Sequence, residues 1–480
     1  MNSVTKFTES ALYNIIIQVC FRSSTFLLNA VLLRFISRSL LGVVNVRLML
    51  LYTTLSFFSG EPFRRACLSR IDKLDRNWRK AVTDASFYAV RQILFAFLTI
   101  FYPENSLLNF GFAMIASSLL YTTMYYSYFA WFLCKNRTFG GENVDSKVFL
   151  QRFSDVLPHL SHGFDREVVR LTVAFFRHSF VKQMLTEGER YVMTLFDVLN
   201  FADQGVYDVV TNLGSLVARI IFAPLEESGY VYFSVSFERG KPLEEQDQQE
   251  TLLATRVFKA LLKLVTLIGF IITVFGFSFS FLALHVYGGT LLSLGRGPIL
   301  LKWYTLYVVL LAINGVTECF SFAIMPESQV DRHQKWLFIF CFGFLIAALS
   351  LTNTFGSVGF ILANCVNMVC RIIYSCNYIN NFYRVDSINS RYMDLDLLKE
   401  LKDSPLNSMT PNTSVFTTLL ASFVITSLSN IIFCCEGTFN TLAHVAVGAI
   451  CLLATVFRIY YTELEFVDFV SNYIFKLKMT

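Results

Sequence analysis

LLNFGFAMIASSLLYTTMYYSYFAWFL, which runs from Leu107 to Leu133, contains no charged residue over 27 positions. A second run, from Leu264 to Leu284, is equally free of charge. A helix needs about 20 mostly apolar residues to cross the hydrocarbon core of a membrane, where every backbone polar group must be hydrogen-bonded within the segment. Both runs therefore predict transmembrane helices, and the chain is predicted to be an all-α polytopic membrane protein.

The composition supports this class. The 480 residues are 54% hydrophobic and 16% charged, whereas soluble chains carry about 25% charged residues. The 50 Phe and 22 Tyr residues suit lipid-facing surfaces and interfacial aromatic belts. The net charge of +5 is too small to indicate a nucleic-acid partner. Membrane lipids are the expected surroundings.

Twelve stretches are long and apolar enough, or nearly so, to span a membrane, and we predict about twelve helices (range 11–14). They cover residues 11–36, 42–59, 84–102, 107–133, 168–186, 204–224, 257–285, 299–325, 335–354, 356–381, 414–434 and 439–461. The fifth stretch is the least apolar because it contains Arg170, Arg177, His178 and Lys182.

The acidic stretch from Gly240 to Glu250 divides these helices into two sets of six. The two sets share a pattern, because Gly111-Phe112 and Tyr126-Ser127 recur as Gly359-Phe360 and Tyr374-Ser375. We predict two pseudo-symmetric six-helix bundles around a central cavity, an arrangement typical of transporters. The predicted boundaries are 1–238 for the N-terminal half, 239–255 for a cytosolic linker, 256–462 for the C-terminal half and 463–480 for a cytosolic tail.

Basic residues predict the orientation, because Lys and Arg that flank spans are retained on the cytosolic side. They cluster after the second and fourth predicted helices, at 64–80 and 135–166, and again in the tail at Lys476 and Lys478. Both termini are therefore predicted to be cytosolic.

Polar residues recur at helical spacing within three of the predicted spans. The stripes are Asn14, Gln18, Arg22, Thr25 and Asn29; Asp208, Asn212, Ser215 and Arg219; and Asn364, Asn367, Arg371 and Ser375. Because a charge in the membrane is costly, such residues usually face a bundle interior or a wet cavity. The alternative is that the stripes only hold helices together through interhelical hydrogen bonds.

Arginines dominate the charges within the predicted spans, and their planar donors match phosphate geometry. We therefore expect an anionic ligand. The first helix has no carboxylate, so no ion coupling is expected. No Walker loop or His-rich cluster is present, so the chain is not expected to be an enzyme or to hold a cofactor or metal. Leu185–Glu189 is predicted to be a short loop with a helix-terminal or gating role.

Several motifs together resemble one known family. They are Gln18-Val19-Cys20-Phe21-Arg22 with Thr25–Asn29, Leu41–Leu48, Glu61–Cys67, Leu185–Tyr191, Gly214–Arg219, Asn314–Phe320 and Gly356–Cys365. On these residues the chain resembles the eukaryotic oligosaccharide translocation proteins of the endoplasmic reticulum, within the multidrug/oligosaccharidyl-lipid/polysaccharide exporter superfamily. The resemblance extends over nearly the whole chain.

The resemblance implies movement of dolichyl-pyrophosphate-linked mannosyl chitobiose oligosaccharide from the cytosolic to the lumenal leaflet of the endoplasmic reticulum, for protein N-glycosylation. Two alternatives stay open, a non-flipping accessory protein of the same pathway and a membrane glycosyltransferase. The residues expected to contact the substrate are Arg22, Asn29, Arg91, Arg219, Asn364 and Arg371, with the arginines on the pyrophosphate and the amides on sugars. Glu61, Arg64 and Glu318 are the expected gating residues.

Overall fold

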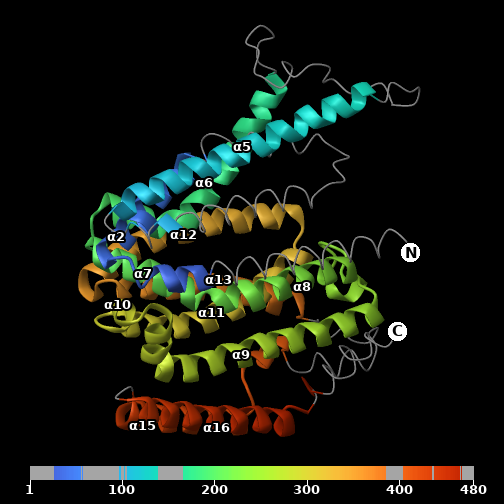
Figure 1. Ribbon diagram of the computed structural model, residues 1–480. Helices are drawn as coiled ribbons and strands as arrows, with labels where there is room; N and C mark the ends of the chain where they lie inside the picture. Colours follow the sequence, from blue (N-terminus) through green and yellow to red (C-terminus); the bar gives the residue numbers. More distant parts are fainter. Residues whose placement is uncertain are drawn as a thin grey trace. The chain divides into compact units, whose positions relative to one another are not determined.

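The computed structural model of the protein describes residues 26–55, 57, 97–98, 102, 105–138, 166–384, 404–434, 437–464 and 466–467. Within these residues the secondary structure is helical and contains no strand, as the all-α prediction requires (Figure 1). The chain divides into two compact units, Met1–Glu187 and Gly188–Thr480. The two units are treated separately below.

The first unit contains α2 (Arg38–Leu41), the π-helix η1 (Gly42–Leu48), α5 (Ser106–Thr138) and most of α6 (Arg166–Leu195). Ser37 caps α2, since its side chain accepts a hydrogen bond from Leu40 N. The buried Asn109 holds the approach to α5, because its Nδ2 donates to Leu98 O and Tyr102 O at 3.1 and 2.9 Å. The charge-free run at 107–133 thus forms a helix, as predicted.

The second unit contains the C-terminal end of α6 and a series of long helices. They are α7 (Phe201–Gly214), η5 (Ala218–Phe222), α8 (Ala223–Ser236), η6 (Leu243–Glu245), α9 (Gln248–Gly288), α10 (Thr290–Ser293), α11 (Gly297–Ile324), α12 (Glu327–Phe355), α13 (Val358–Phe382), η8 (Pro405–Met409), α15 (Thr413–Phe433) and α16 (Thr438–Thr462).

Local sequence explains where these helices begin and end. Asn200, Asp247 and Asn412 cap α7, α9 and α15, and each side chain accepts a hydrogen bond from a first-turn N–H that has no partner within its helix. Gly289 (φ 61°) and Gly356 (φ 62°) end α9 and α12 in backbone conformations that favour glycine. α9 therefore begins inside the acidic stretch that we predicted to be a linker.

Helix α11 forms the centre of the second unit, where it packs against α7, α8, α9 and α13. Close contact with α9 depends on small residues, because Gly269 lies against the backbone of Val309. Phe233, Phe258 and Phe320 join α8, α9 and α11 in a fully buried cluster, with ring centroids 4.2 to 6.0 Å apart. The α15–α16 pair packs on α9.

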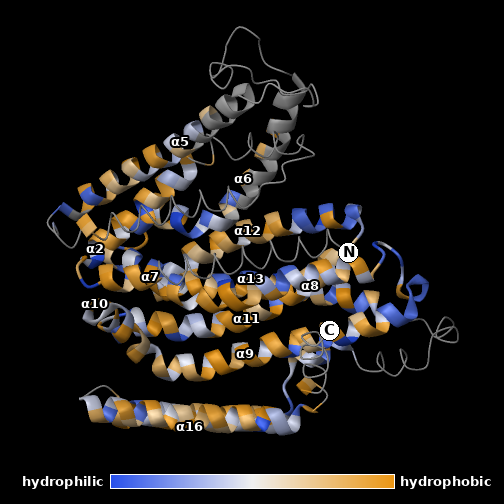
Figure 2. Cartoon of the chain, turned by 45° about the vertical axis from the view of Figure 1, so that its right-hand side comes forward, coloured by the Kyte–Doolittle hydropathy of each residue, from blue (hydrophilic) through white to orange (hydrophobic). Residues whose placement is uncertain are grey.

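Eight candidate membrane spans occur among the described residues, so the chain is a multi-pass membrane protein. They are Leu107–Met124, Phe201–Ser236, Gln248–Gly288, Gly297–Ile324, Glu327–Phe355, Val358–Phe382, Pro405–Phe433 and Thr438–Thr462. Hydrophobic residues cover most of these helices, and hydrophilic residues gather at the α8–α9 connection and the first turns of α12 (Figure 2). The fifth predicted span forms α6 but is not among the eight. The first three predicted spans lie wholly or partly outside the described residues.

Candidate functional site

A cavity of about 750 Å³ lies within the second unit, lined by residues of η5, α8, α11, α12 and α13. Its charged lining residues are Arg219, Arg239, Arg371, Glu226, Glu227 and Glu318. The volume lies within the range of about 300–1,000 Å³ that is usual for ligand sites. The lining is balanced in charge, whereas we expected mainly cations.

The shortest ion pair at the cavity joins Arg371 on α13 to Glu318 on α11. Their side chains are 22% and 13% exposed. Glu318 Oε2 accepts from Arg371 Nη2 and also from Asn314 Nδ2, at 2.9 Å, so both donors meet at one carboxylate oxygen. Asn314 lies one helical turn before Glu318 and therefore fixes the carboxylate from its own helix. Glu318 and Arg371, predicted in separate roles, are in direct contact.

A second carboxylate, that of Glu226 on α8, lies near the Glu318–Arg371 ion pair. It lies directly against Gly315 of α11, where a Cβ atom would overlap it. Electrostatic interactions link Glu226 to Glu318, Arg371 and Glu227. Gly315 therefore provides the space for this side chain, and two carboxylates share the neighbourhood of one guanidinium.

His333 on α12 lies beside Glu318 and Arg371. It is 1% exposed and stacks on Tyr374 at 4.7 Å and beside Phe322 at 4.8 Å. Its Nε2 lies 3.9 Å from Glu318 Oε1, which is beyond hydrogen-bond distance. Neither ring nitrogen has a hydrogen-bond partner.

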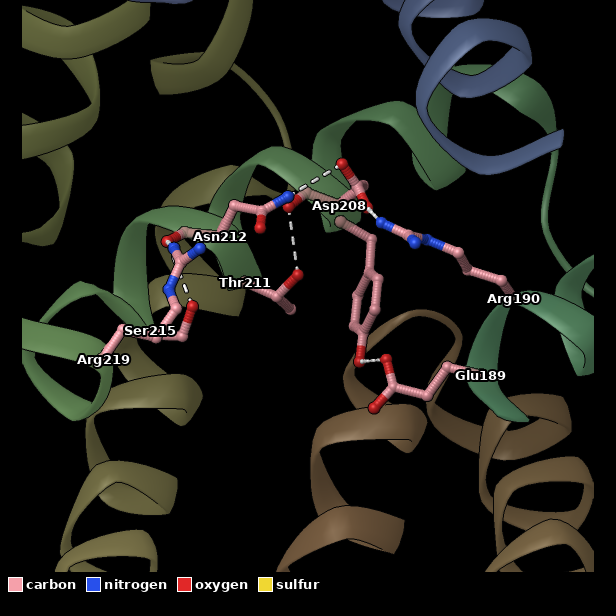
Figure 3. A network of polar contacts seen from close by, with 8 residues as sticks. Glu189, Arg190, Asp208, Thr211, Asn212, Ser215 and Arg219 are labelled. Atoms are coloured by element: carbon pink, nitrogen blue, oxygen red, sulfur yellow. Dashed lines mark hydrogen bonds and ion pairs between the residues drawn. The ribbon is translucent and has the colours of Figure 1, made fainter. Parts of the chain in front are cut away.

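Arg219 enters the cavity from η5, a π-helical segment between α7 and α8. Its Nη2 donates to Asn212 O, and Ser215 Oγ donates to the same oxygen at 3.1 Å (Figure 3). π-Helical segments often occur at functional sites because the extra residue per turn redirects side chains. The second polar stripe thus forms bonds along its own helix and also brings one arginine to the cavity.

A second polar network connects α6, α7 and α13. Glu189 accepts hydrogen bonds from Tyr207 Oη, at 2.8 Å, and from Asn364 Nδ2. Asp208 accepts from Arg190 Nη2 and Asn212 Nδ2 at 2.9 and 3.0 Å (Figure 3). Each of the four carboxylate oxygens has a donor, so we call this group the closed network. Asn364, predicted to contact sugars, belongs to the closed network and does not line the cavity.

The other predicted site residues are distributed as follows. Arg22, Glu61, Arg64 and Arg91 lie outside the described residues. Asn29 is half-buried in the first unit, where its carbonyl accepts from Leu33 N at 2.9 Å. Arg219, Arg371 and Glu318 line the cavity.

Sequence reasoning named Glu318 but did not place Glu226, Glu227 or His333 at the site. Leu185–Glu189, predicted to be a short loop, lies within α6, which continues to Leu195. Helix periodicity relates residues on one helix only, so it could not show that Glu226 and His333 meet Glu318 from two other helices. The Gly315–Glu318 spacing was a usable signal, because a small residue one turn from a carboxylate leaves room for a neighbouring helix.

Among the described residues, no group of three or more His, Cys, Asp or Glu side chains is placed to hold a metal ion. The site is therefore an assembly of guanidinium, carboxylate, amide and imidazole groups. Guanidinium groups such as those of its three arginines form charge-assisted hydrogen bonds with anionic groups.

Comparison with known proteins identifies the family. The model of the family described as Rft protein matches residues 6–85 and 73–473. The chain belongs to the Rft protein family. Man(5)GlcNAc(2)-PP-dolichol translocation protein RFT1 of Xenopus tropicalis is 37% identical, with 97% of this chain and 96% of the relative covered. The RFT1 relative of Mus musculus is 37% identical, with 95% of this chain and 95% of the relative covered. The RFT1 relative of Drosophila melanogaster is 32% identical, with 78% of this chain and 85% of the relative covered. No solved structure matches this Rft protein.

Proposed function

We propose that this protein moves dolichyl-pyrophosphate-linked mannosyl chitobiose oligosaccharide from the cytosolic to the lumenal leaflet of the endoplasmic reticulum membrane. The observation that carries the proposal is a cavity with three arginines in a chain that matches, over 97% of its length, a relative named as a Man(5)GlcNAc(2)-PP-dolichol translocation protein. The arginines bind the pyrophosphate, which is the only charged part of such a glycolipid.

The need for a protein follows from the glycan. Each hydroxyl that enters hydrocarbon without a partner costs about 2–7 kcal/mol, so a chain of sugars cannot cross unaided. A hydrated cavity offers hydrogen-bond partners, while the polyisoprenyl tail remains in lipid. In our proposal two six-helix halves, within about twelve helices, move about the cavity to expose it to one leaflet and then the other.

The position of the cavity along the helices agrees with entry from the cytosol. Glu318 lies near the C-terminal end of α11, which ends at Ile324, and Val330 lines the cavity just after α12 begins at Glu327. The α8–α9 connection meets this end, because Gly240 N donates to Ile324 O at 3.2 Å. Basic Arg239 and Lys241 favour the cytosolic side for this end. The cavity would then face the leaflet in which the glycolipid is made.

Transfer by purified protein tests the proposal. The protein is reconstituted into liposomes that contain a fluorescent dolichyl-pyrophosphate oligosaccharide, and the fraction reaching the inner leaflet is followed with time. We expect transfer above the rate of protein-free liposomes. The Arg219→Ala and Arg22→Ala variants should transfer more slowly while their membrane abundance stays unchanged.

The same assay separates the alternatives. Binding of the glycolipid without transfer would contradict a transporter and favour an accessory protein. Transfer of a sugar onto the lipid, dependent on an acid such as Glu187, would instead favour a glycosyltransferase. If the Arg219→Ala protein disappears from the membrane, Arg219 is structural and the assignment of the arginines is wrong.

A further inference from the structure

Arg371 is already occupied. Its ion pair with Glu318 neutralises the guanidinium, and Glu226 adds a second negative charge nearby. A pyrophosphate that takes the Nη2 donor of Arg371 must therefore displace a carboxylate. A carboxylate left in a poorly solvated site without a cation is costly, so it needs a new partner.

His333 is placed to become that partner. It is 1% exposed, its Nε2 lies 3.9 Å from Glu318 Oε1, and neither nitrogen has a hydrogen-bond partner. Buried polar atoms without partners are rare in proteins and call for an explanation. A small rotation of the Glu318 side chain away from Arg371 would bring its oxygen within hydrogen-bond distance of the imidazole.

We propose that Glu318 is a built-in counter-ion that occupies Arg371 until a pyrophosphate group takes its place, and that Glu318 then pairs with His333 as the two residues together take up one proton. This inference rests on the proposed function and specifies how its site is regulated. The proton comes from water and no covalent bond changes.

The charged groups around Glu318 are consistent with the uptake of one proton when the ligand binds. The titratable and charged groups that face this place are Glu226, Glu227 and Tyr230 on α8, Arg219 on η5, Arg239 beyond α8, Cys319 on α11, His333 on α12 and Arg371 and Tyr374 on α13. α9 also packs on α11, and among the described residues none of its side chains lines the cavity. With Arg371 taken by the ligand, Glu318 loses the arginine that it contacts among the described residues, and one proton restores the balance.

Titration calorimetry on the full-length protein in lipid nanodiscs tests this. The probes are inorganic pyrophosphate and farnesyl pyrophosphate, which share a head group, and each is measured in two buffers of different ionisation enthalpy. Because the probe ionises equally with both proteins, subtracting the value for Glu318→Gln leaves the proton uptake that depends on Glu318. We expect the wild-type protein to take up about one proton more than Glu318→Gln, and its affinity to rise by up to about tenfold per unit of falling pH.

The variants make separate predictions. Glu318→Gln should bind both probes about tenfold more tightly, because Arg371 no longer has a charged competitor. Glu318→Asp has a shorter side chain, which weakens the ion pair with Arg371, and should show a smaller gain in affinity. This variant replaces Glu318→Gln in the test if the Gln protein does not fold. His333→Phe keeps the aromatic stack and should bind about tenfold more weakly. His444→Phe is the matched control, since His444 is also buried and stacked, on Phe279 at 4.1 Å, and it should behave as wild type.

Three outcomes overturn the inference. Equal affinity and equal proton uptake in wild type and Glu318→Gln would show that Glu318 does not compete. Unchanged binding in His333→Phe would show that the histidine is not the acceptor. A response limited to inorganic pyrophosphate would remove the link to a lipid head group. Absence of glycolipid transfer in the liposome assay, with binding of both probes intact, would instead contradict the proposed function and leave the exchange at Glu318 standing.

Discussion

The closed network and the cavity cluster use the same chemistry with different results. In the closed network, Arg190, Asn212, Asn364 and Tyr207 together satisfy every oxygen of Glu189 and Asp208. The cavity cluster is defined by Asn314, Glu318, His333, Arg371 and Glu226. In it, two donors meet at one oxygen of Glu318, and the ring nitrogens of His333 have no hydrogen-bond partner. A complete network fixes helices, whereas an incomplete one beside a cavity can exchange partners.

The largest expected effect comes from removing one charge from each network. Asp208→Asn should destabilise the protein by about 3 kcal/mol, because the buried Asp208 accepts from both Arg190 and Asn212, and a neutral amide with one oxygen cannot accept from both. Glu318→Gln should cost less than about 1 kcal/mol, since Glu226 keeps a negative charge near Arg371 and the glutamine oxygen can still accept a hydrogen bond. The free energy of unfolding of the detergent-solubilised variants, together with their membrane abundance, measures this difference. Equal losses would show that both networks are structural.

A methyl group placed beside Glu226 gives the next effect. Gly315→Ala should destabilise the protein by about 1–3 kcal/mol, because the new Cβ displaces a carboxylate that touches the helix. Gly343→Ala is the matched control, since no atom lies within 4 Å of its Cβ position on α12. It should stabilise the helix by about 0.5–1 kcal/mol. A neutral Gly315→Ala, measured in the same unfolding assay, would mean that Glu226 moves away without cost.

A smaller and purely functional effect is expected from Arg371→Lys. Lysine keeps the charge and loses the planar donors that match a pyrophosphate. We expect about tenfold slower transfer in liposomes, equivalent to about 1.4 kcal/mol, with normal abundance. Arg458→Lys is the control, because Arg458 on α16 donates to Ser414 at 2.7 Å and does not line the cavity. Equal rates for the two variants would exclude a bidentate role for Arg371.

The sequence predicted the helices far better than the partners of their polar residues. The charge-free runs at 107–133 and 264–284 lie within α5 and α9, because length and hydropathy are properties of one segment. The Asn364–Arg371 stripe predicted that both residues face a bundle interior or a wet cavity, with interhelical hydrogen bonds as the alternative. It could not predict that Asn364 contacts Glu189 and Arg371 contacts Glu318, because those contacts depend on how separate helices pack.

The predicted repeat shows the same limit. Gly111 and Gly359 correspond in sequence, yet a Cβ at Gly359 would meet the backbone of Leu351, whereas a Cβ at Gly111 would meet no described residue outside its own helix backbone within 4 Å. Matching letters therefore do not require matching packing. Gly359→Ala should lower stability and Gly111→Ala should not, which tests whether the two positions are equivalent.

The smallest effect concerns a single hydroxyl of the closed network. Tyr207→Phe removes the donor to Glu189 Oε2 and keeps the ring, which lies 5.5 Å from Phe360. We expect a loss of about 1 kcal/mol in the free energy of unfolding, the usual net value of one hydrogen bond. Tyr307→Phe is the control, because Tyr307 is also buried, at 7% exposed against 2% for Tyr207, and no hydrogen bond of its hydroxyl is found among the described residues. Because Glu189 retains Asn364, transfer of the glycolipid should be unchanged in both variants. Slower transfer in Tyr207→Phe at normal stability would mean that the closed network also changes during transport. The closed network and the cavity cluster would then both exchange partners, to different extents.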